Sequence, residues 1–483
     1  MHVVFVARGF ESIGISQLSA FCKKEGHTVS LVFSHGLFND NYNLNSKLLG
    51  KVFDDKKRII KKIRKEKPDL IGFSSISPEY EINLQLAREI KKRNKLVKIV
   101  FGGIHIALFP EDIIKEDAID FAVYGDGEPA LAGIIKAMKS KNYKDPIPNT
   151  YHINNNEIIK GEKEEYDIET QPFADKEIWK NHIKIEDDWV IMTSRGCPYS
   201  CSFCSNSIKD IKKKKQRRSV NSVIQELSES KKKYKIKYID FLDDIFTCDK
   251  KWLKEFSEKY KELINIPYQC NIHPMMFDKQ ILDLLTNSGC VLVSIGIQTL
   301  DEKYKVRVLN RYDTTEKIKE CLRLLVNSNL KFTVDHILGL PNEPMSSMEK
   351  ARELYSEYTP NRIQTFWYQY LPKTKMTIDA IKTGEILESP KSFRDNTNIK
   401  KEDLIIYKKY EFIFKILPAI PKQLRKRIKI KHLRFIPNSI LSAIAFLVDT
   451  INSLIFYKLA RAYLKNIAFQ ILNHIKQSKH DVK

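Results

Sequence analysis

Two series of short apolar runs, separated by amphipathic segments, constrain the fold of this 483-residue chain more than any other feature. Runs rich in valine, isoleucine and phenylalanine are typical of buried strands, and apolar residues at helical spacing are typical of the connecting helices. Strands that alternate with helices form parallel sheets. The pattern therefore predicts the α/β class, and the length predicts two or three domains.

The first series covers residues 1–140 and predicts a doubly wound, Rossmann-like domain. Its strands are expected at 2–8, 28–33, 69–77 and 98–106, followed by a strand, loop and helix over 121–138. Gly26 is expected to end the first helix, because glycine is a common helix stop. Such sheets bind ligands beyond the carboxyl ends of their strands. The polar, asparagine-rich residues 141–187 are predicted to be a linker that contains one hairpin.

The second series covers residues 188–390 and predicts a partial (β/α)6 barrel of the TIM type, with its working face at the carboxyl ends of the strands. Its strands are expected at 188–194, 237–243, 267–273, 291–299, 331–339 and 362–371. Residues 391–483 are predicted to form a helical region. Within it, 421–436 holds seven Lys or Arg and no acidic residue, and 435–457 is an apolar run in which Asp449 is the only charge.

The chain is strongly basic, with 82 Lys and Arg against 60 Asp and Glu and a formal net charge of +22. This charge favours an anionic partner, and nucleic acid, an acidic membrane face and a phosphorylated substrate all fit it. A hydrophobic content of 42% excludes a disordered chain. The N-terminus, MHVVFVARGF, lacks the pattern of a secretory signal, so we expect a cytoplasmic protein with reduced thiols.

Three of the eight cysteines, Cys197, Cys201 and Cys204, lie within eight residues, after the first expected barrel strand. The other five are scattered and are expected to be ordinary core residues. A structural zinc site closes with four ligands, usually from two pairs, and the sequence has no second C-x-x-C pair. An iron–sulfur cube on three thiolates would leave one iron open to a substrate or cofactor. The spacing favours the open cluster and leaves zinc and coincidence as alternatives.

The segment CPYSCSFC resembles the C-x3-C-x2-C loop of the radical S-adenosylmethionine (SAM) superfamily, including Phe203 before the last cysteine. Further segments resemble, in order, the subgroup with an N-terminal cobalamin-binding domain: IGFSSIS, VFGGIHIALFPE, YGDGEPA, FLDDIFT, GIQT, HILGLPNE and YLPKT. The resemblance covers residues 1 to about 390. It implies that the three cysteines hold a 4Fe-4S cluster whose open iron binds SAM. It also implies an electron donor such as flavodoxin or ferredoxin, whose electron cleaves SAM to a 5′-deoxyadenosyl radical.

The resemblance also implies where SAM binds. Asp243 and Asp244, at the end of the second barrel strand, are expected near the SAM ammonium, although aspartate also caps helices. Gln298 and Thr299 end the fourth strand, near the SAM carboxylate and ribose, where relatives commonly have Glu-Ser. Gly339 would let the backbone approach the adenine closely. The full set of implied SAM contacts is Phe203, Asp243, Asp244, Gln298, Thr299 and Gly339, and no residue is assigned a catalytic role.

For cobalamin, the expected contacts follow the strands of the first domain. They are Ser74, Ser75, Ser77, Gly102, Gly103, Gly125 and Gly127. Paired glycines after a buried strand leave room for a macrocycle or its nucleotide tail, and a tight turn is the alternative explanation. The loop ARGFESIG lacks the D-x-H-x-x-G pattern whose histidine ligates cobalt in many such domains. The sequence therefore predicts cobalamin without a histidine ligand, or a degenerate domain that binds none.

The resemblance implies a cobalamin-dependent radical SAM enzyme that methylates an unactivated carbon of a small-molecule or lipid-like substrate. One alternative is radical cyclisation, rearrangement or C–C bond formation without methyl transfer, for which a lipid or isoprenoid is a candidate substrate. A second alternative is a cobalamin or cluster sensor without catalysis. Residues 421–457 fit either a helical subdomain or a peripheral membrane contact. Nucleic acid is not expected, because the RNA-thiolating branch usually ends in a small β-barrel and this tail is predicted to be helical.

Overall fold

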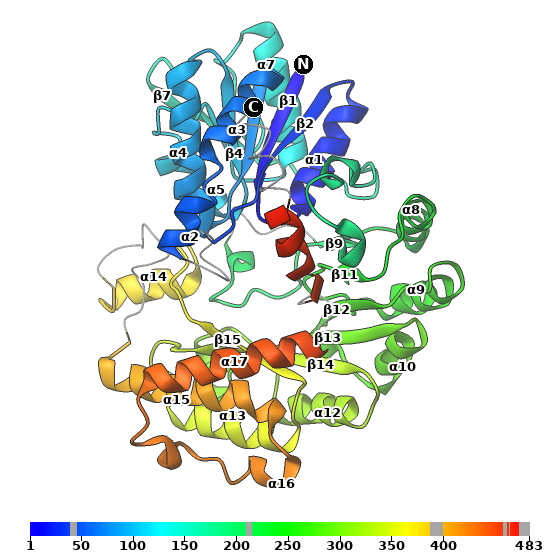
Figure 1. Ribbon diagram of the computed structural model, residues 1–483, viewed down its shortest axis with the longest axis vertical. Coiled ribbons are helices and arrows are strands. Elements are labelled where there is room, and N and C mark those ends of the chain that lie inside the picture. The colour runs from blue at the N-terminus through cyan, green and yellow to red at the C-terminus, as the bar shows by residue number, and fades with distance from the viewer. Residues whose placement is uncertain (39–45, 209–214, 387–398, 457–460, 463, 473–483) are drawn as a thin grey trace. The chain divides into compact units, whose positions relative to one another are not determined.

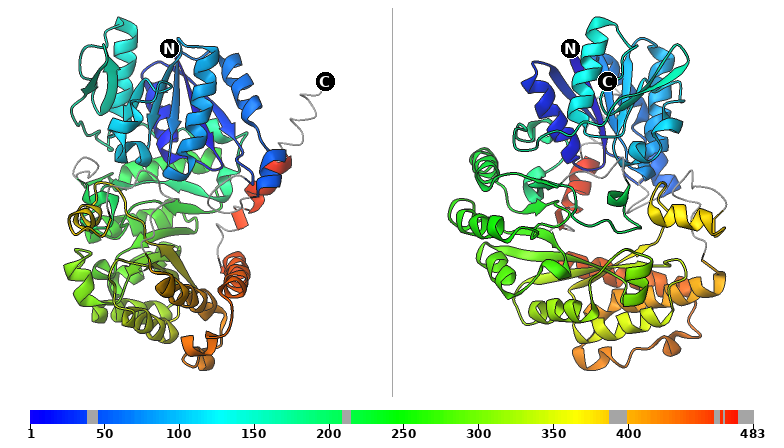
Figure 2. Two further views of the ribbon diagram at one scale, coloured as in Figure 1. Left: turned by 90° about the vertical axis from the view of Figure 1, so that its left-hand side faces the viewer. Right: turned by 180° about the vertical axis from the view of Figure 1, so that it is seen from behind.

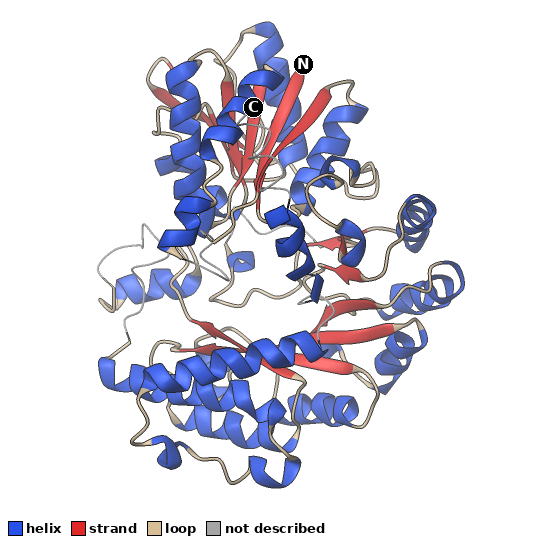
Figure 3. Cartoon of the chain, viewed as in Figure 1, coloured by secondary structure: helices blue, strands red, loops and turns tan. Residues whose placement is uncertain are grey.

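The computed structural model describes residues 1–38, 46–208, 215–386, 399–456, 461–462 and 464–472. It consists of two compact units. Unit 1 is formed by residues 1–185 with 208–213 and 463–483, and unit 2 by residues 186–207 with 214–462. Both units combine a largely parallel sheet with helices, so the α/β class is confirmed (Figure 3).

Unit 1 is built on a seven-stranded sheet with the order β2-β1-β3-β4-β5-β6-β7. Its strands are β1 (His2–Arg8), β2 (Thr28–Ser34), β3 (Leu70–Ser74), β4 (Lys98–Gly102), β5 (Phe121–Val123), β6 (Thr150–Asn154) and β7 (Glu157–Lys160). The first five are parallel, in the order of a flavodoxin-like doubly wound sheet. The predicted hairpin is β6–β7, and because β6 pairs antiparallel with β5, it extends this sheet.

Helices pack on this sheet around an apolar core (Figure 1). They are α1 (Ile13–Lys24), α3 (Lys56–Glu66), α4 (Ser77–Arg93), α5 (Ile104–Leu108), α6 (Pro110–Ile113) and α7 (Gly127–Ser140). A further short helix, α2 (Lys47–Val52), is largely exposed. Helix α1 contacts α7, and α3 contacts α4. Gly26 follows α1 with a φ of +79°, as the sequence predicts.

Two expected strands of unit 1 are too long. The strand predicted over 98–106 ends at Gly102, and residues 104–108 form α5. Gly103 causes this change, because its φ of +100° leaves the extended conformation. The strand predicted over 69–77 likewise stops at Ser74, and α4 begins at Ser77 because Pro78 suits the first turn of a helix.

Unit 2 is built on a six-stranded, fully parallel sheet with the order β8-β11-β12-β13-β14-β15, which matches the six predicted strands. Its strands are β8 (Trp189–Ile191), β11 (Ile239–Phe241), β12 (Tyr268–Ile272), β13 (Cys290–Gln298), β14 (Lys331–Leu338) and β15 (Arg362–Trp367). The crossover helices are α8 (Val220–Lys233), α9 (Lys250–Leu263), α10 (Lys279–Asn287), α11 (Glu302–Arg307), α12 (Thr315–Val326) and α13 (Ser346–Glu357). Helix α14 (Lys375–Lys382) follows β15.

The two faces of this sheet differ in chemistry. One face buries large apolar side chains such as Phe241, Val293 and Val334. The other face carries polar side chains at paired positions of neighbouring strands, which the parallel register brings side by side: Asp240, Gln269, Asn271, Ser294, Thr333, Asp335 and Gln364. A polar face on a fully parallel sheet is a feature of a functional interior, because such sheets are otherwise apolar on both faces.

The described part of the C-terminal region predicted over 391–483 is mainly helical, and it is divided between the two units. Helices α15 (Lys401–Ile416), α16 (Lys422–Arg425) and α17 (Asn438–Phe456) belong to unit 2, where α15 packs on β15, α13 and α17. Residues 464–472 are helical and belong to unit 1, where the Gln470 side chain donates to the Gly9 carbonyl oxygen at 2.9 Å. The domain boundaries predicted at 140, 187 and 390 stay predictions, and the last lies in 387–398, outside the described residues.

Candidate active site

The three clustered cysteines lie on one loop that follows β8 in unit 2. A short antiparallel pair, β9 (Ser194–Arg195) with β10 (Gln216–Arg217), closes the base of this loop. The loop is tight, since the Cys204 amide donates to the Cys201 carbonyl oxygen at 3.0 Å. All three thiols are half-buried and free of disulfides. Partial burial protects a cluster from water and still leaves it open to a cofactor.

Backbone hydrogen bonds hold the cysteine loop to other segments of unit 2. The Ser202 amide donates to the Leu309 carbonyl oxygen at 2.9 Å, and the Met376 amide donates to the Ser202 carbonyl oxygen at 3.1 Å. Phe203 packs against an apolar cluster that includes Tyr304, Leu309, Ile337, Leu340 and Tyr368. Phe203 thus anchors the loop, in addition to the SAM contact predicted for it.

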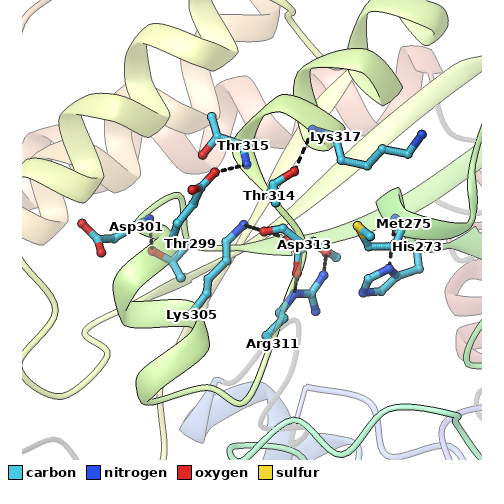
Figure 4. Close-up of polar contacts among 12 residues, drawn as sticks. His273, Met275, Thr299, Asp301, Lys305, Arg311, Asp313, Thr314, Thr315 and Lys317 are labelled. Carbon is cyan, nitrogen blue, oxygen red and sulfur yellow. Dashed lines mark hydrogen bonds and ion pairs between the residues drawn. The ribbon is translucent and has the colours of Figure 1, made fainter.

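A buried group of charges lies beside the cysteine loop, and no motif in the sequence predicted it. Asp313 accepts from Lys305 Nζ at 2.8 Å and from Arg311 Nε at 2.5 Å, and all three side chains are buried (Figure 4). The Arg311 guanidinium also contacts the Gly296 carbonyl oxygen and donates to the Cys201 thiol. Arg311 therefore places a positive charge beside Cys201, one of the three predicted cluster ligands.

His273 also faces this region, from the end of β12. Its ring stacks on Tyr199 of the cysteine loop, with centroids 4.3 Å apart. Burial, assisted by the positive charge of Arg311, lowers the pKa of His273 to about 3. The Met275 amide donates to Nδ1 at 3.2 Å, so the neutral ring carries its proton on Nε2. Nε2 is buried and has no partner among the described residues (Figure 4).

The two aspartates predicted at the SAM ammonium have different surroundings. Asp243 is fully buried, and its carboxylate accepts from the Thr193 amide at 3.1 Å, the Thr193 hydroxyl at 2.8 Å and the Ser194 hydroxyl. Asp244 is exposed and accepts from the Asn206 side chain at 3.1 Å. Its charge raises the pKa of Cys197 and Cys204, although burial is the larger cause for both thiols. Asp244 is therefore the carboxylate beside the cysteines, and Asp243 fixes the strand ends.

Gln298 and Thr299, at the end of β13, also have different surroundings. Gln298 has a φ of +70°, and its amide nitrogen lies 2.6 Å from where a Cβ on Gly296 would be, so the amide covers that glycine. Thr299 is fully buried and donates to Glu343 Oε1, and its hydroxyl lies 2.8 Å from that of Ser347. Burial raises the pKa of Glu343 to about 7. Gln298 faces the polar side of the sheet, while Thr299 belongs to a buried network.

Gly339 follows β14 with a φ of +74°, and a Cβ there would lie 2.3 Å from Ile399 Cδ1. The positive φ therefore favours glycine at this position, whatever contacts the adenine, whereas the end of the Ile399 side chain could move aside. Deeper on the polar face, Asp335 Oδ1 is buried and has no hydrogen-bond partner within the described part of the chain. Burial raises the pKa of Asp335 to about 6, and Arg362 opposes that rise. Asp335 is thus a buried carboxylate on the polar face of the sheet, and no role was assigned to it from the sequence.

The residues predicted for cobalamin lie at or just after the ends of β3, β4 and β5, whose carboxyl ends meet at one edge of the unit 1 sheet. Gly102 has open space, since an added Cβ would meet only Val123, at 3.7 Å. Gly103 instead accommodates the backbone of Ser75, whose oxygen would lie 2.6 Å from an added Cβ. The tight-turn explanation thus accounts for Gly103, and Gly102 remains the open position.

The other predicted cobalamin contacts are engaged within unit 1. The Ser75 hydroxyl accepts from Asn83 at 2.8 Å, and Ser77 lies 2.9 Å from Nδ1 of the buried His105. An added Cβ at Gly125 would meet Asn149 at 2.6 Å, and one at Gly127 would meet Leu18 at 2.9 Å. These side chains and glycines shape the edge, and their contact with cobalamin stays a prediction, as it does for Ser74.

Across the described ranges, no three His, Cys, Asp or Glu side chains converge on a single metal ion. A 4Fe-4S cube needs a different arrangement, because each thiolate binds its own iron atom. Cys197, Cys201 and Cys204 are close enough to influence one another's pKa values, and they lie on one loop. Soft thiolate donors suit iron, so the residues present fit such a cluster.

Known proteins match both units. The domain model of the radical SAM superfamily matches residues 191–355, and the B12 binding domain matches residues 4–135. An uncharacterized methyltransferase of Pyrococcus horikoshii is 27% identical, over 73% of this chain and 75% of its own length. The anaerobic magnesium-protoporphyrin IX monomethyl ester cyclase of Rubrivivax gelatinosus is 25% identical, over 77% of this chain and 68% of its own length.

A solved structure shares the fold. It is that of the cobalamin-dependent S-adenosylmethionine radical enzyme OxsB with aqua-cobalamin and S-adenosylmethionine bound. Its TM-score is 0.69 at 14% identity, over 99% of this chain and 80% of that one. The chain therefore belongs to the radical SAM superfamily, in the group with an N-terminal B12-binding domain. It is a radical SAM enzyme with methyltransferases among its relatives, and its cofactors are a 4Fe-4S cluster, SAM and cobalamin.

Proposed function

We propose that this enzyme methylates an unactivated carbon of a small-molecule substrate. The observation that supports it is a cysteine loop of radical SAM spacing on a six-stranded parallel sheet, in the same chain as a B12-binding domain. When bound, the cluster and SAM supply a 5′-deoxyadenosyl radical, and cobalamin supplies the methyl group. Overall, R–H, two SAM and two electrons give R–CH3, S-adenosylhomocysteine, methionine and 5′-deoxyadenosine, and the electrons come from a reduced flavodoxin or ferredoxin.

The protein's own residues bind and orient these groups. Cys197, Cys201 and Cys204 hold the cluster, and Arg311 stabilises the charge on Cys201. Phe203, Asp244, Gln298 and the backbone at Gly339 contact SAM, while Asp243 and Thr299 hold the strand ends that carry these contacts.

The polar inner face of the unit 2 sheet supplies the contacts to the substrate. Asp335, whose buried Oδ1 has no partner among the described residues, accepts a hydrogen bond from the substrate. Gly102 would leave room for cobalamin at the edge of the unit 1 sheet, because an added Cβ there would meet only Val123, at 3.7 Å. The loop after β1, whose sequence is ARGFESIG, contains no histidine that could ligate cobalt.

The same residues serve a second candidate function, a radical cyclisation without methyl transfer. The 25% identity to the magnesium-protoporphyrin IX monomethyl ester cyclase of Rubrivivax gelatinosus supports it. A lipid-like or isoprenoid substrate, and a peripheral membrane location through residues 421–457, fit either chemistry.

Anaerobic reconstitution tests the proposal. The protein is loaded with iron, sulfide and cobalamin and is given a reductant and SAM whose methyl group carries deuterium. A polar metabolite extract and a lipid extract are added separately, and products are followed by mass spectrometry. Methyl transfer predicts a deuterium-labelled product together with S-adenosylhomocysteine and 5′-deoxyadenosine. Substrate-dependent 5′-deoxyadenosine without S-adenosylhomocysteine would instead establish the cyclase type of reaction.

A further inference from the structure

Helix α17 has two sides with opposite surroundings. Leu441, Ala445 and Asn452 are buried, on the side that packs against α15. Large aliphatic residues at helical spacing form the other side and are exposed by 44–59%: Ile440, Ile444, Leu447, Ile451 and Ile455. We call these five residues the α17 stripe. A continuous row of exposed aliphatic side chains marks an interaction surface.

The chain enters α17 from a strongly basic segment. Residues 421–434 form α16 and a short 3-10 helix, Ile430–Leu433, and lead directly into α17 (Figure 2). Six basic side chains of this segment are exposed: Lys422, Lys426, Arg427, Lys429, Lys431 and Arg434. Phe435, between this segment and the helix, is 91% exposed. Exposed cations, an exposed aromatic ring and an aliphatic row thus follow one another along the chain.

Unit 2 holds the basic segment in place. Arg352 of α13 donates to the Ile428 carbonyl oxygen at 3.2 Å, and Lys409 of α15 donates to the Arg434 carbonyl oxygen at 3.3 Å. The cations are therefore presented by an ordered part of the fold.

Helix α17 is the one helix of the described chain that is long and apolar enough to cross a bilayer. Its contacts favour a different orientation. Asp449 forms a two-pronged ion pair with Arg362 of β15, with both N–O distances at 2.8 Å. A spanning helix would have to break this pair and leave α15, whereas a helix lying in the membrane surface keeps both contacts and buries only its stripe.

From this arrangement we infer that the α17 stripe and the basic segment form a docking surface for an anionic phospholipid bilayer, with α17 parallel to the membrane plane. Cations beside an aliphatic row match headgroup phosphates above acyl chains. A second copy of this chain fits less well, because it carries a net charge of +22 itself and so does not match the exposed cations of the basic segment. The inference does not depend on the methyl transfer chemistry.

Vesicle sedimentation with the full-length protein tests the inference. Vesicles of phosphatidylglycerol mixed with phosphatidylcholine are compared with vesicles of phosphatidylcholine alone, at low and high salt. The stripe variant carries Ile444→Gln, Leu447→Gln and Ile451→Gln, and its control carries Leu96→Gln, Leu263→Gln and Val306→Gln, which are also exposed. The charge variant carries Arg427→Gln, Lys429→Gln and Lys431→Gln, and its control carries Lys232→Gln, Lys254→Gln and Lys303→Gln.

We expect binding to the anionic vesicles that weakens with salt. The charge variant should bind about 100-fold more weakly, which is about 3 kcal/mol at about 1 kcal/mol for each basic residue. The stripe variant should lose on the order of tenfold or more. Both controls should bind like the wild type, alkaline carbonate should release the bound protein, and all variants should keep the wild-type melting temperature.

Three results would overturn the inference. The first is equal binding to both vesicle types, or no binding. The second is resistance to carbonate extraction, which would show that α17 spans the bilayer. The third is a stripe variant that binds vesicles normally but elutes at a smaller size than the wild type, which would show that a second copy covers the stripe.

Discussion

Glu343 provides a direct test of the buried network that joins the ends of β13 and β14. Its side chain is 8% exposed, accepts at Oε1 from Thr299 and Ser347, and has a buried Oε2 without a partner among the described residues. Burial raises its pKa from 4.5 to about 7. The neutral carboxyl is therefore favoured in the folded protein.

The raised pKa of Glu343 sets the size and the sign of its contribution to the pH dependence of stability. The stabilisation by the neutral carboxyl is fully present below pH 4.5 and is lost as pH rises through about 7. Across that window, Glu343 should cost the folded state about 3 kcal/mol, at about 1.4 kcal/mol for each pH unit. Glu343→Gln keeps the shape and the acceptor oxygen but removes the titration. The free-energy difference between variant and wild type should therefore shift by about 3 kcal/mol in favour of the variant between pH 4 and pH 8.

Thermal unfolding of the cofactor-free protein at several pH values measures this shift. A melting temperature difference that grows by roughly 5 °C in favour of Glu343→Gln is expected. Glu258→Gln, at an exposed position of α9, is the matched control and should follow the wild type at every pH. Parallel pH profiles for Glu343→Gln and the wild type would refute the claim that burial holds this carboxyl neutral.

Further predictions follow from other parts of the chain. Gly103→Ala should destabilise unit 1 by about 1–3 kcal/mol, because Gly103 has a positive φ and lies against the Ser75 backbone. Gly102→Ala should fold normally and bind cobalamin more weakly. Equal melting temperatures for the two variants would contradict this contrast. A double-mutant cycle of Arg362→Met and Asp449→Asn should give a coupling of about 1 kcal/mol by denaturant unfolding, and zero coupling would show that the pair does not hold α17. Single alanine variants of Cys197, Cys201 or Cys204 should lose the iron of the cluster in a metal assay, while Cys248→Ala should keep it.

Local patterns in the sequence were sufficient for much of the fold. Valine-rich runs form their strands because β-branched residues fit a buried sheet, and all six barrel strands form at the expected places. The cysteine loop was also predictable, because its three ligands are close neighbours in the sequence. The domain matches confirm the α/β fold, the family and the cofactors.

What the sequence did not show depends on contacts between distant residues. The hairpin β6–β7 extends the sheet because it finds the free edge of β5, and no local signal specifies that pairing. Arg311 reaches Cys201 across 110 residues, through a buried partner, Asp313, that looks like an ordinary surface residue in the sequence. The conflict at Gly103 was likewise hidden, because only the folded chain brings Ser75 beside it.

Electron paramagnetic resonance of the reduced, reconstituted protein tests the central claim most directly. Three thiolates on a cube leave one iron for SAM, so the cluster signal of the wild type should change when SAM is added. Metal analysis of the same sample should find iron and sulfide. A signal that stays the same with SAM, or zinc bound at the three cysteines, would contradict the account.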